Sequence, residues 1–191
     1  MINAFRISIP FILFLLLLSS GCIRTKRLPV NFSVPNIGVS STKLDAELKS
    51  LTISVARPDE AIGEIDPGIA VHTGLWKTAL EEAFNRMAIF KDDSPKKVSL
   101  AVKILKFDTP ALGVGRTTHA SARYEIIDRS DGSIIFTTDI STSGEGRFKF
   151  DIFADDPVGS QSVDGINRSV QKNIIQFLQA LETVDIEKPM F

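Results

Sequence analysis

Residues 118–142, "THASARYEIIDRSDGSIIFTTDIST", have the pattern of two strands joined by a turn. In the first half, apolar and polar side chains alternate: Ala120, Ala122, Tyr124 and Ile126 against His119, Ser121, Arg123 and Glu125. The second half repeats the alternation, with Ile134, Phe136, Thr138 and Ile140 against Ile135, Thr137 and Asp139. The segment between them, "DRSDGS", consists of residues that favour turns. We therefore predict an antiparallel hairpin with one face toward a core and one toward water.

Two further strands are predicted on the N-terminal side of this hairpin. "KVSLAVKILKF", residues 97–107, places Val98, Leu100, Val102 and Ile104 on one face. "SLTISVARP", residues 50–58, alternates Leu51, Ile53 and Val55 with polar residues and is stopped by Pro58. Both segments have the period of two that is typical of half-buried strands.

Two amphipathic helices complete the pattern. "GLWKTALEEAFNRMAIF", residues 74–90, has apolar residues three and four apart: Leu75, Trp76, Ala79, Leu80, Ala83, Phe84 and Met87. "SVDGINRSVQKNIIQFLQALETV", residues 162–184, does the same with Val163, Ile166, Val170, Ile174, Phe177, Leu178 and Leu181. Such spacing places the apolar side chains along one stripe of a helix.

The resulting order is strand–helix–strand–strand–strand–helix. It predicts an α+β fold, a two-layer sandwich in which two helices cover one face of a four-stranded, mostly antiparallel sheet. Residues 50–184 are sufficient for one domain with its own core, and residues 185–191 form a C-terminal tail.

The first 21 residues have the features of a secretory signal peptide. Arg6 precedes a short apolar run, and the small residues Ser19, Ser20 and Gly21 follow it. The run is shorter than the roughly 20 residues that a membrane-spanning helix needs. A cleaved signal is therefore predicted, and an uncleaved anchor is the alternative.

The only cysteine of the chain, Cys22, directly follows these small residues. The segment "LSSGC" resembles the lipobox of bacterial lipoproteins, which implies that Cys22 becomes the first residue and carries acyl chains such as palmitate. The sequence departs from the lipobox at Ser19, where leucine is usual. Ile23 stands where aspartate would favour the inner membrane, so the resemblance implies the periplasmic face of the outer membrane. A chance cysteine after a signal is the alternative.

Chemistry favours acylation of Cys22. An exported chain with a single cysteine has no partner for an internal disulfide, and acylation removes the exposed thiol. Two or more acyl chains then hold a protein stably at a bilayer. Residues 22–49 follow, with two prolines, scattered polar residues and no periodicity, and they predict a flexible tether.

The composition excludes some functions. Lys and Arg number 22 against 23 Asp and Glu, so a basic surface for nucleic acid is not expected. The two histidines, His72 and His119, stand far apart and are interpreted as surface residues rather than a catalytic base or a ligand. No zinc-ligand set, nucleophile elbow or phosphate-binding loop is present. We therefore expect no enzyme, no metal and no cofactor.

One segment suggests contact with another molecule. "GEGRFKFDIFADDPVG", residues 144–159, carries four large apolar side chains close together: Phe148, Phe150, Ile152 and Phe153. Gly144 and Gly146 interrupt the register of the preceding strand, which predicts a bent strand end or a separate flap. We predict either an apolar edge that docks an envelope protein or lipid, or a cover for the core.

The segments "LWKTALEEAFNRMAIF" (75–90), "LAVKILKFD" (100–108) and "NRSVQKNIIQFLQAL" (167–181) resemble those of small envelope lipoproteins with one α+β domain. Examples are activators of peptidoglycan synthases, the curli-secretion lipoprotein and auxiliary lipoproteins of lipid-trafficking ABC transporters. This resemblance implies a non-catalytic binding or accessory module, anchored to the membrane through its lipid, for lipid transport, cell-wall synthesis or secretion. An enzyme acting on an envelope substrate, such as an acyltransferase, and a structural envelope lipoprotein are the alternatives.

Overall fold

A computed structural model of the chain describes residues 29–109, 117–146 and 157–184, the last range with its side chains from Ser162 onward. Seven elements follow one another: β1 (Glu47–Val55), η1 (Pro67–His72), α2 (Thr73–Met87), β2 (Lys97–Asp108), β3 (Thr117–Asp128), β4 (Ile134–Glu145) and α3 (Pro157–Leu181). The predicted signal peptide and Cys22 lie outside the described residues.

The four strands form one sheet in the order β1-β2-β3-β4. β1 pairs with β2 in parallel, whereas β2 with β3 and β3 with β4 are antiparallel. The parallel pair is possible because η1 and α2 form the crossover between β1 and β2. The predicted mostly antiparallel, four-stranded sheet is thus confirmed.

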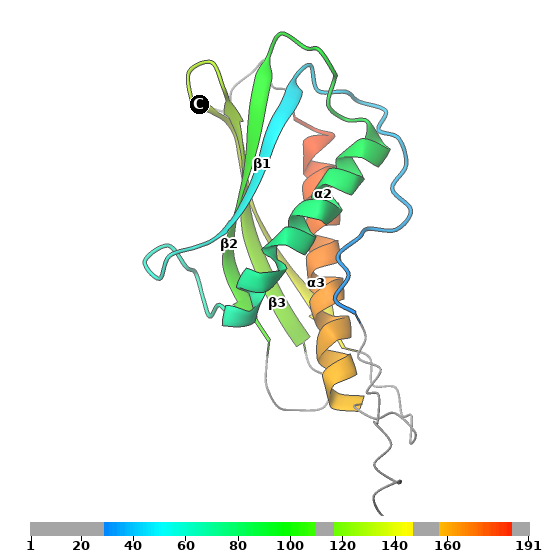
Figure 1. Ribbon diagram of the computed structural model, residues 1–191, viewed down its shortest axis with the longest axis vertical. Helices are drawn as coiled ribbons and strands as arrows, with labels where there is room; N and C mark the ends of the chain where they lie inside the picture. The colour runs from blue at the N-terminus through cyan, green and yellow to red at the C-terminus, as the bar shows by residue number, and fades with distance from the viewer. Residues whose placement is uncertain (1–28, 110–116, 147–156, 185–191) are drawn as a thin grey trace, which may run out of the picture.

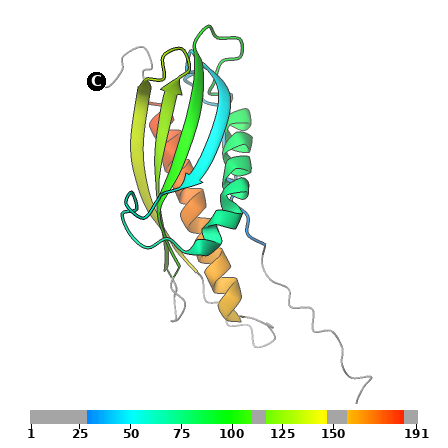
Figure 2. The ribbon, with the colours of Figure 1, turned by 60° about the vertical axis from the view of Figure 1, so that its left-hand side comes forward.

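Both long helices cover the same face of the sheet, so the molecule has two layers (Figures 1 and 2). The core lies between the layers and takes the predicted apolar face of each strand, for example Leu100, Val102, Tyr124 and Ile126. Trp76 and Leu80 of α2 and Ile174 and Phe177 of α3 close it from the helix side. The opposite face of the sheet carries Thr52, Lys103, Arg123 and Asp139 and borders solvent, as predicted.

Two irregularities change the predicted alternation. The pairing of β2 with β3 shifts between Ile104 and Lys106, and Leu105 is an extra residue that brings Phe107 back to the core face. The pairing of β3 with β4 shifts at Ile126–Ile127. As a result Ile135 is buried at 5% exposure and Ile134 is 41% exposed, the reverse of the prediction.

Residues 29–46 differ most from expectation. The sequence predicts a flexible tether over residues 22–49, yet Phe32, Val34, Leu44 and Ala46 are buried in the core. Phe32 contacts the ring of Trp76 edge-on, with centroids 6.1 Å apart. The segment has no helical or strand period because it packs as irregular chain, with single apolar side chains inserted at uneven spacing.

Helix α3 approaches the sheet closely at β4. A Cβ built on Gly144 would lie 2.1 Å from the carbonyl oxygen of Gly165 and 2.4 Å from the amide nitrogen of Ser169. The sequence predicts an interruption at Gly144, but β4 continues through it to Glu145. The missing side chain is what allows α3 to pack there.

A buried polar cluster joins α3 to the centre of the sheet. The Tyr124 hydroxyl donates to Asn173 Oδ1 at 2.7 Å, and the ring stacks on Phe177 with centroids 4.0 Å apart. Asn173 Nδ2 donates to the carbonyl oxygen of Ile140 at 2.9 Å. Burial raises the pKa of Tyr124 well above its ordinary value, so this hydroxyl remains a neutral structural donor.

Candidate binding groove

An open groove of about 520 Å³ lies between β1 and α2. Five apolar side chains contribute to its lining: Leu48, Leu51, Phe84, Ala88 and Phe90. Polar and charged side chains complete it: Lys43, Glu47, Lys49, Ser50, Glu81, Asn85, Lys91 and Asp92. Phe84 and Phe90 meet edge-on with ring centroids 5.3 Å apart. This edge-to-face contact fixes the aromatic part of the wall.

The groove runs beside a free edge of the sheet. β1 is the first strand in the sheet order, and within the described residues no strand pairs with its other edge. The amide of Ala56 donates to the carbonyl oxygen of Ile104 on β2. Because alternate residues of a strand direct their backbone groups to the same side, those of Leu51, Ile53 and Val55 face away from β2. These three residues can therefore hydrogen-bond to an added chain.

A bulge interrupts this edge near its start. The register of β1 on β2 shifts between Leu48 and Ser50, so Lys49 is an extra residue. Its ammonium group bonds to Glu47, which also accepts from Lys97. These two lysines, Lys49 first, lower the pKa of the Glu47 carboxyl. The mouth of the groove therefore carries fixed charges of both signs.

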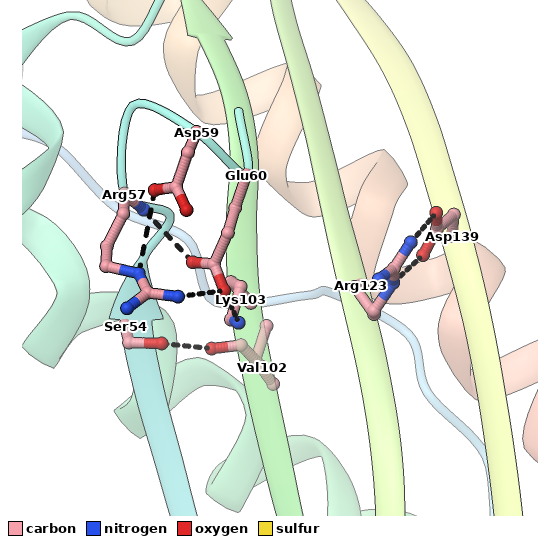
Figure 3. Close-up of polar contacts among 8 residues, drawn as sticks. All are labelled: Ser54, Arg57, Asp59, Glu60, Val102, Lys103, Arg123 and Asp139. Carbon is pink, nitrogen blue, oxygen red and sulfur yellow. Dashed lines mark hydrogen bonds and ion pairs between the residues drawn. The ribbon is translucent and has the colours of Figure 1, made fainter. Parts of the chain in front are cut away.

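The outer face of the sheet has its own charge network, shown in Figure 3. The loop after β1 folds over β2, where Glu60 accepts from Lys103 Nζ at 2.7 Å and from the Arg57 guanidinium at 3.3 Å. The Arg57 amide also donates to Glu60 at 3.2 Å. These donors, with Lys103 the strongest, lower the pKa of Glu60 from 4.5 to about 2.

A second ion pair lies on the next two strands of the same face (Figure 3). Arg123 of β3 holds Asp139 of β4 through two bonds of 2.7 and 2.8 Å. This bidentate contact lowers the pKa of Asp139 and raises that of Arg123. Arg57, Lys103 and Arg123 are thus all engaged with carboxylates of this chain.

The two histidines do not meet. His72 lies beside Phe32, with ring centroids 6.4 Å apart. His119 is exposed on the outer face, where the strand register places it between Asp108 and Ser143. Asp108, His119 and Ser143 are the residue types of a hydrolase triad. In the described part of the chain, however, no hydrogen bond links these three side chains. Neither histidine lines the groove.

The described residues offer neither a metal cluster nor a membrane-spanning helix. Across residues 29–109, 117–146 and 157–184, no three His, Cys, Asp or Glu side chains gather as metal ligands would. In those ranges no helix combines the length and apolarity needed to cross a bilayer.

The sequence-predicted contact residues lie elsewhere. Phe148, Phe150, Ile152 and Phe153, like Cys22, fall outside the described residues, so their roles remain predictions. The groove itself was missed, because strand alternation does not show which strand ends up at an edge. The extra residue at Lys49 breaks the alternation and was the one local signal of an irregular edge.

No protein-family profile matches the sequence, and no curated protein matches it. The chain is similar to several solved structures. A candidate lipoprotein from Caulobacter crescentus is 13% identical, with 70% of this chain and 88% of that chain covered and a TM-score of 0.43. A protein of family DUF330 from Xanthomonas campestris is 14% identical, with 81% and 97% covered and a TM-score of 0.47.

PelC from Paraburkholderia phytofirmans, a dodecamer, is 12% identical, with 77% of this chain and 93% of that chain covered and a TM-score of 0.43. With TM-scores below 0.5 in all three cases, function has to be argued from the residues of this chain. The resemblance to peptidoglycan-synthase activators, the curli-secretion lipoprotein and ABC-transporter auxiliary lipoproteins stays a prediction.

Proposed function

We propose that this protein is a lipid-anchored envelope module that binds an extended segment of another envelope protein along the free edge of β1. The groove beside that edge carries the proposal, because it combines open backbone groups with apolar side chains in one place. The anchor is Cys22, supported by the signal-like segment before it and by the lack of a second cysteine. The outer membrane is the proposed location because Ile23 follows Cys22.

Strand addition suits this geometry. An extended peptide beside β1 would bond to the outward backbone groups of Leu51, Ile53 and Val55 and place alternate side chains toward the groove. Leu48 and Phe90 offer apolar contact, and the charged side chains on the rim of the groove would select the sequence. Backbone bonds supply affinity in this mode, and the side-chain pockets supply specificity.

The state of the charged groups favours contact over catalysis. Three described carboxylates, Glu47, Glu60 and Asp139, are each held by cations, which lowers their pKa and keeps them ionised at neutral pH. A general acid or base needs a pKa near the working pH instead. An accessory role in lipid transport, cell-wall synthesis or secretion fits an anchored module of this kind.

Photo-crosslinking in the native organism tests the groove. A photoreactive residue at Asn85, which lines the groove, should crosslink to one partner protein. The control is Val39, which is 75% exposed beside the end of α2 and does not line the groove. Equal crosslinking to the same partner from both positions would contradict the proposed site.

Two substitutions at one position then test strand addition. Ile53→Pro removes an outward amide without removing a bond to β2, and proline is tolerated at such edge positions. Ile53→Ala removes the same side chain but keeps the amide. The Asn85 crosslink should persist in Ile53→Ala. It should fall at least about tenfold in Ile53→Pro, because proline removes one hydrogen bond to the added strand and its ring also blocks the approach of that strand. Equal crosslinking in both variants would refute the backbone pairing.

A further inference from the structure

Large apolar side chains are exposed unevenly over the molecule. Among the described residues five stand out: Val71 at 78%, Val39 at 75%, Ile62 at 61%, Leu75 at 42% and Ile134 at 41% exposure. Three of them, Ile62, Val71 and Leu75, belong to the region where β1 and β2 end and α2 begins. Backbone bonds join this region together, because Ile62 donates to Leu105 and Asp66 donates to Phe107 near the end of β2.

Val71 and Leu75 form the most compact part of this group. They are four residues apart across the junction of η1 and α2, so they lie on neighbouring turns. The intervening Gly74 is also exposed and adds no charge. The nearest helical cation, Lys77, is directed to Glu81 at 3.7 Å. We call Val71 and Leu75 the apolar tip.

The described chain starts close to the apolar tip. Phe32 packs against His72, the residue next to Val71. Asn167 of α3 fixes the chain just before it, accepting from the Asn31 amide at 2.9 Å and donating to the Pro29 carbonyl oxygen at 3.3 Å. Figures 1 and 2 both place the first described residues and the start of α2 in the lower half of the domain.

The chain between Pro29 and Cys22 is short. Six residues separate them. A fully extended chain over this stretch reaches about 25 Å. An acylated Cys22 would therefore hold this end of the domain near the bilayer surface. The exposed Val39 lies at the other end, because the adjacent Ser40 amide donates to Met87 at the end of α2.

We infer that the apolar tip rests in the bilayer surface and acts as a second, non-covalent membrane contact; this rests on the proposed acylation of Cys22. Valine and leucine side chains are suited to the boundary of head groups and acyl chains. The lipid anchor raises the effective concentration of the tip at the membrane, so a weak contact suffices. Helix α3 begins lower than the start of α2 in both views, so the domain must lean toward α2 to make this contact (Figures 1 and 2).

The test uses the mature, acylated protein in vesicles of phosphatidylethanolamine and phosphatidylglycerol. A nitroxide is attached at Val71→Cys or, as the matched control, at Val39→Cys, and collision with oxygen and with an aqueous nickel chelate is measured. Acylation leaves no other thiol to label, because Cys22 is the only cysteine. The oxygen-to-nickel ratio should be at least about threefold higher at Val71 than at Val39, since oxygen concentrates in the acyl region. Leu75→Cys repeats the measurement one turn along.

Three other outcomes would overturn the inference, each in its own way. Vesicle-bound protein with equal ratios at Val71 and Val39 would leave the anchor standing and refute the membrane contact. A Val71 label shielded from both reagents would indicate that a second copy of the chain covers the tip. Lipid labelling in the native organism is checked first, with Cys22→Ala as the unlabelled control. Wild-type protein that takes up no acyl label there and does not float with the vesicles would refute the anchor itself.

Discussion

At Gly144, helix α3 lies so close to β4 that an added methyl group would meet the backbone of α3, 2.1 Å from the Gly165 oxygen and 2.4 Å from the Ser169 nitrogen. Neither atom can move without moving the helix. Gly144→Ala should therefore reduce the free energy of unfolding by about 3 kcal/mol or more, as overpacking does in a close-packed interior. Urea unfolding followed by circular dichroism measures this change.

Gly165 provides the control for that prediction. The nearest atom to its added Cβ, the Gly144 oxygen, lies at 3.1 Å. Alanine in place of glycine also improves helix propensity by about 1 kcal/mol. Gly165→Ala should therefore change the free energy of unfolding by no more than about 1 kcal/mol. A loss of about 1 kcal/mol or less in Gly144→Ala as well would show that the approach of α3 to β4 is looser than described.

The lowered pKa of Glu60 predicts how the stability of the fold depends on pH. Its pKa in the folded protein is about 2, against an ordinary 4.5, because Lys103 and Arg57 bind the carboxylate. A carboxyl group whose pKa is lowered in the folded protein stabilises the fold at pH values above its ordinary pKa. This contribution is lost as the pH falls toward about 2, the pKa of Glu60 in the folded protein. The difference in urea midpoint between the wild type and Glu60→Gln should be full at about pH 6 and more than half lost at about pH 3.

The effect of salt on the difference in urea midpoint provides an internal control. Glu60 borders solvent, so raising the ionic strength should reduce the same difference at about pH 6. A midpoint difference that is constant from about pH 6 to about pH 2 would mean that the charge of Glu60 does not contribute to stability.

At the scale of elements, residues 29–46 serve as part of the core rather than as a spacer. Phe32 is 1% exposed and sits between His72 and Trp76. Phe32→Ala should lower the free energy of unfolding by about 3–5 kcal/mol, the usual effect of emptying a buried aromatic site. Thermal and urea unfolding of the full chain measure it.

Val39→Ala is the matched variant in the same segment. The Val39 side chain is 75% exposed. Its substitution should therefore change the free energy of unfolding by less than about 0.5 kcal/mol. Phe32→Ala with wild-type stability would instead support the flexible tether that the sequence suggests.

At the scale of the whole molecule, periodicity predicted the element order, the faces of the strands and the two-layer packing. These features depend on alternation within one segment, as in Ala120, Ala122 and Tyr124, which all face the core. Features that depend on contacts between distant segments could not be predicted. Phe32 does not belong to a periodic pattern of apolar residues. The need for glycine at position 144 becomes clear only when the structure shows Gly165 of α3 lying against it.

The candidate groove shows the same limit. Its lining comes from β1, α2 and the residues after α2, and its open side exists only because β1 pairs with β2 and with no other described strand. The local sequence of β1 is that of any half-buried strand. Strand order was therefore the missing information.

The extra residue at Lys49 has a consequence for the proposed attachment to a membrane. Anchored proteins diffuse in two dimensions and meet one another often, and an open strand edge can pair with other copies and grow into fibres. A lysine placed at a bulge twists and charges the start of that edge, leaving only a short straight stretch, residues 51–55. The edge is then long enough for the short segment of the proposed partner but too short to support continuous stacking of identical chains.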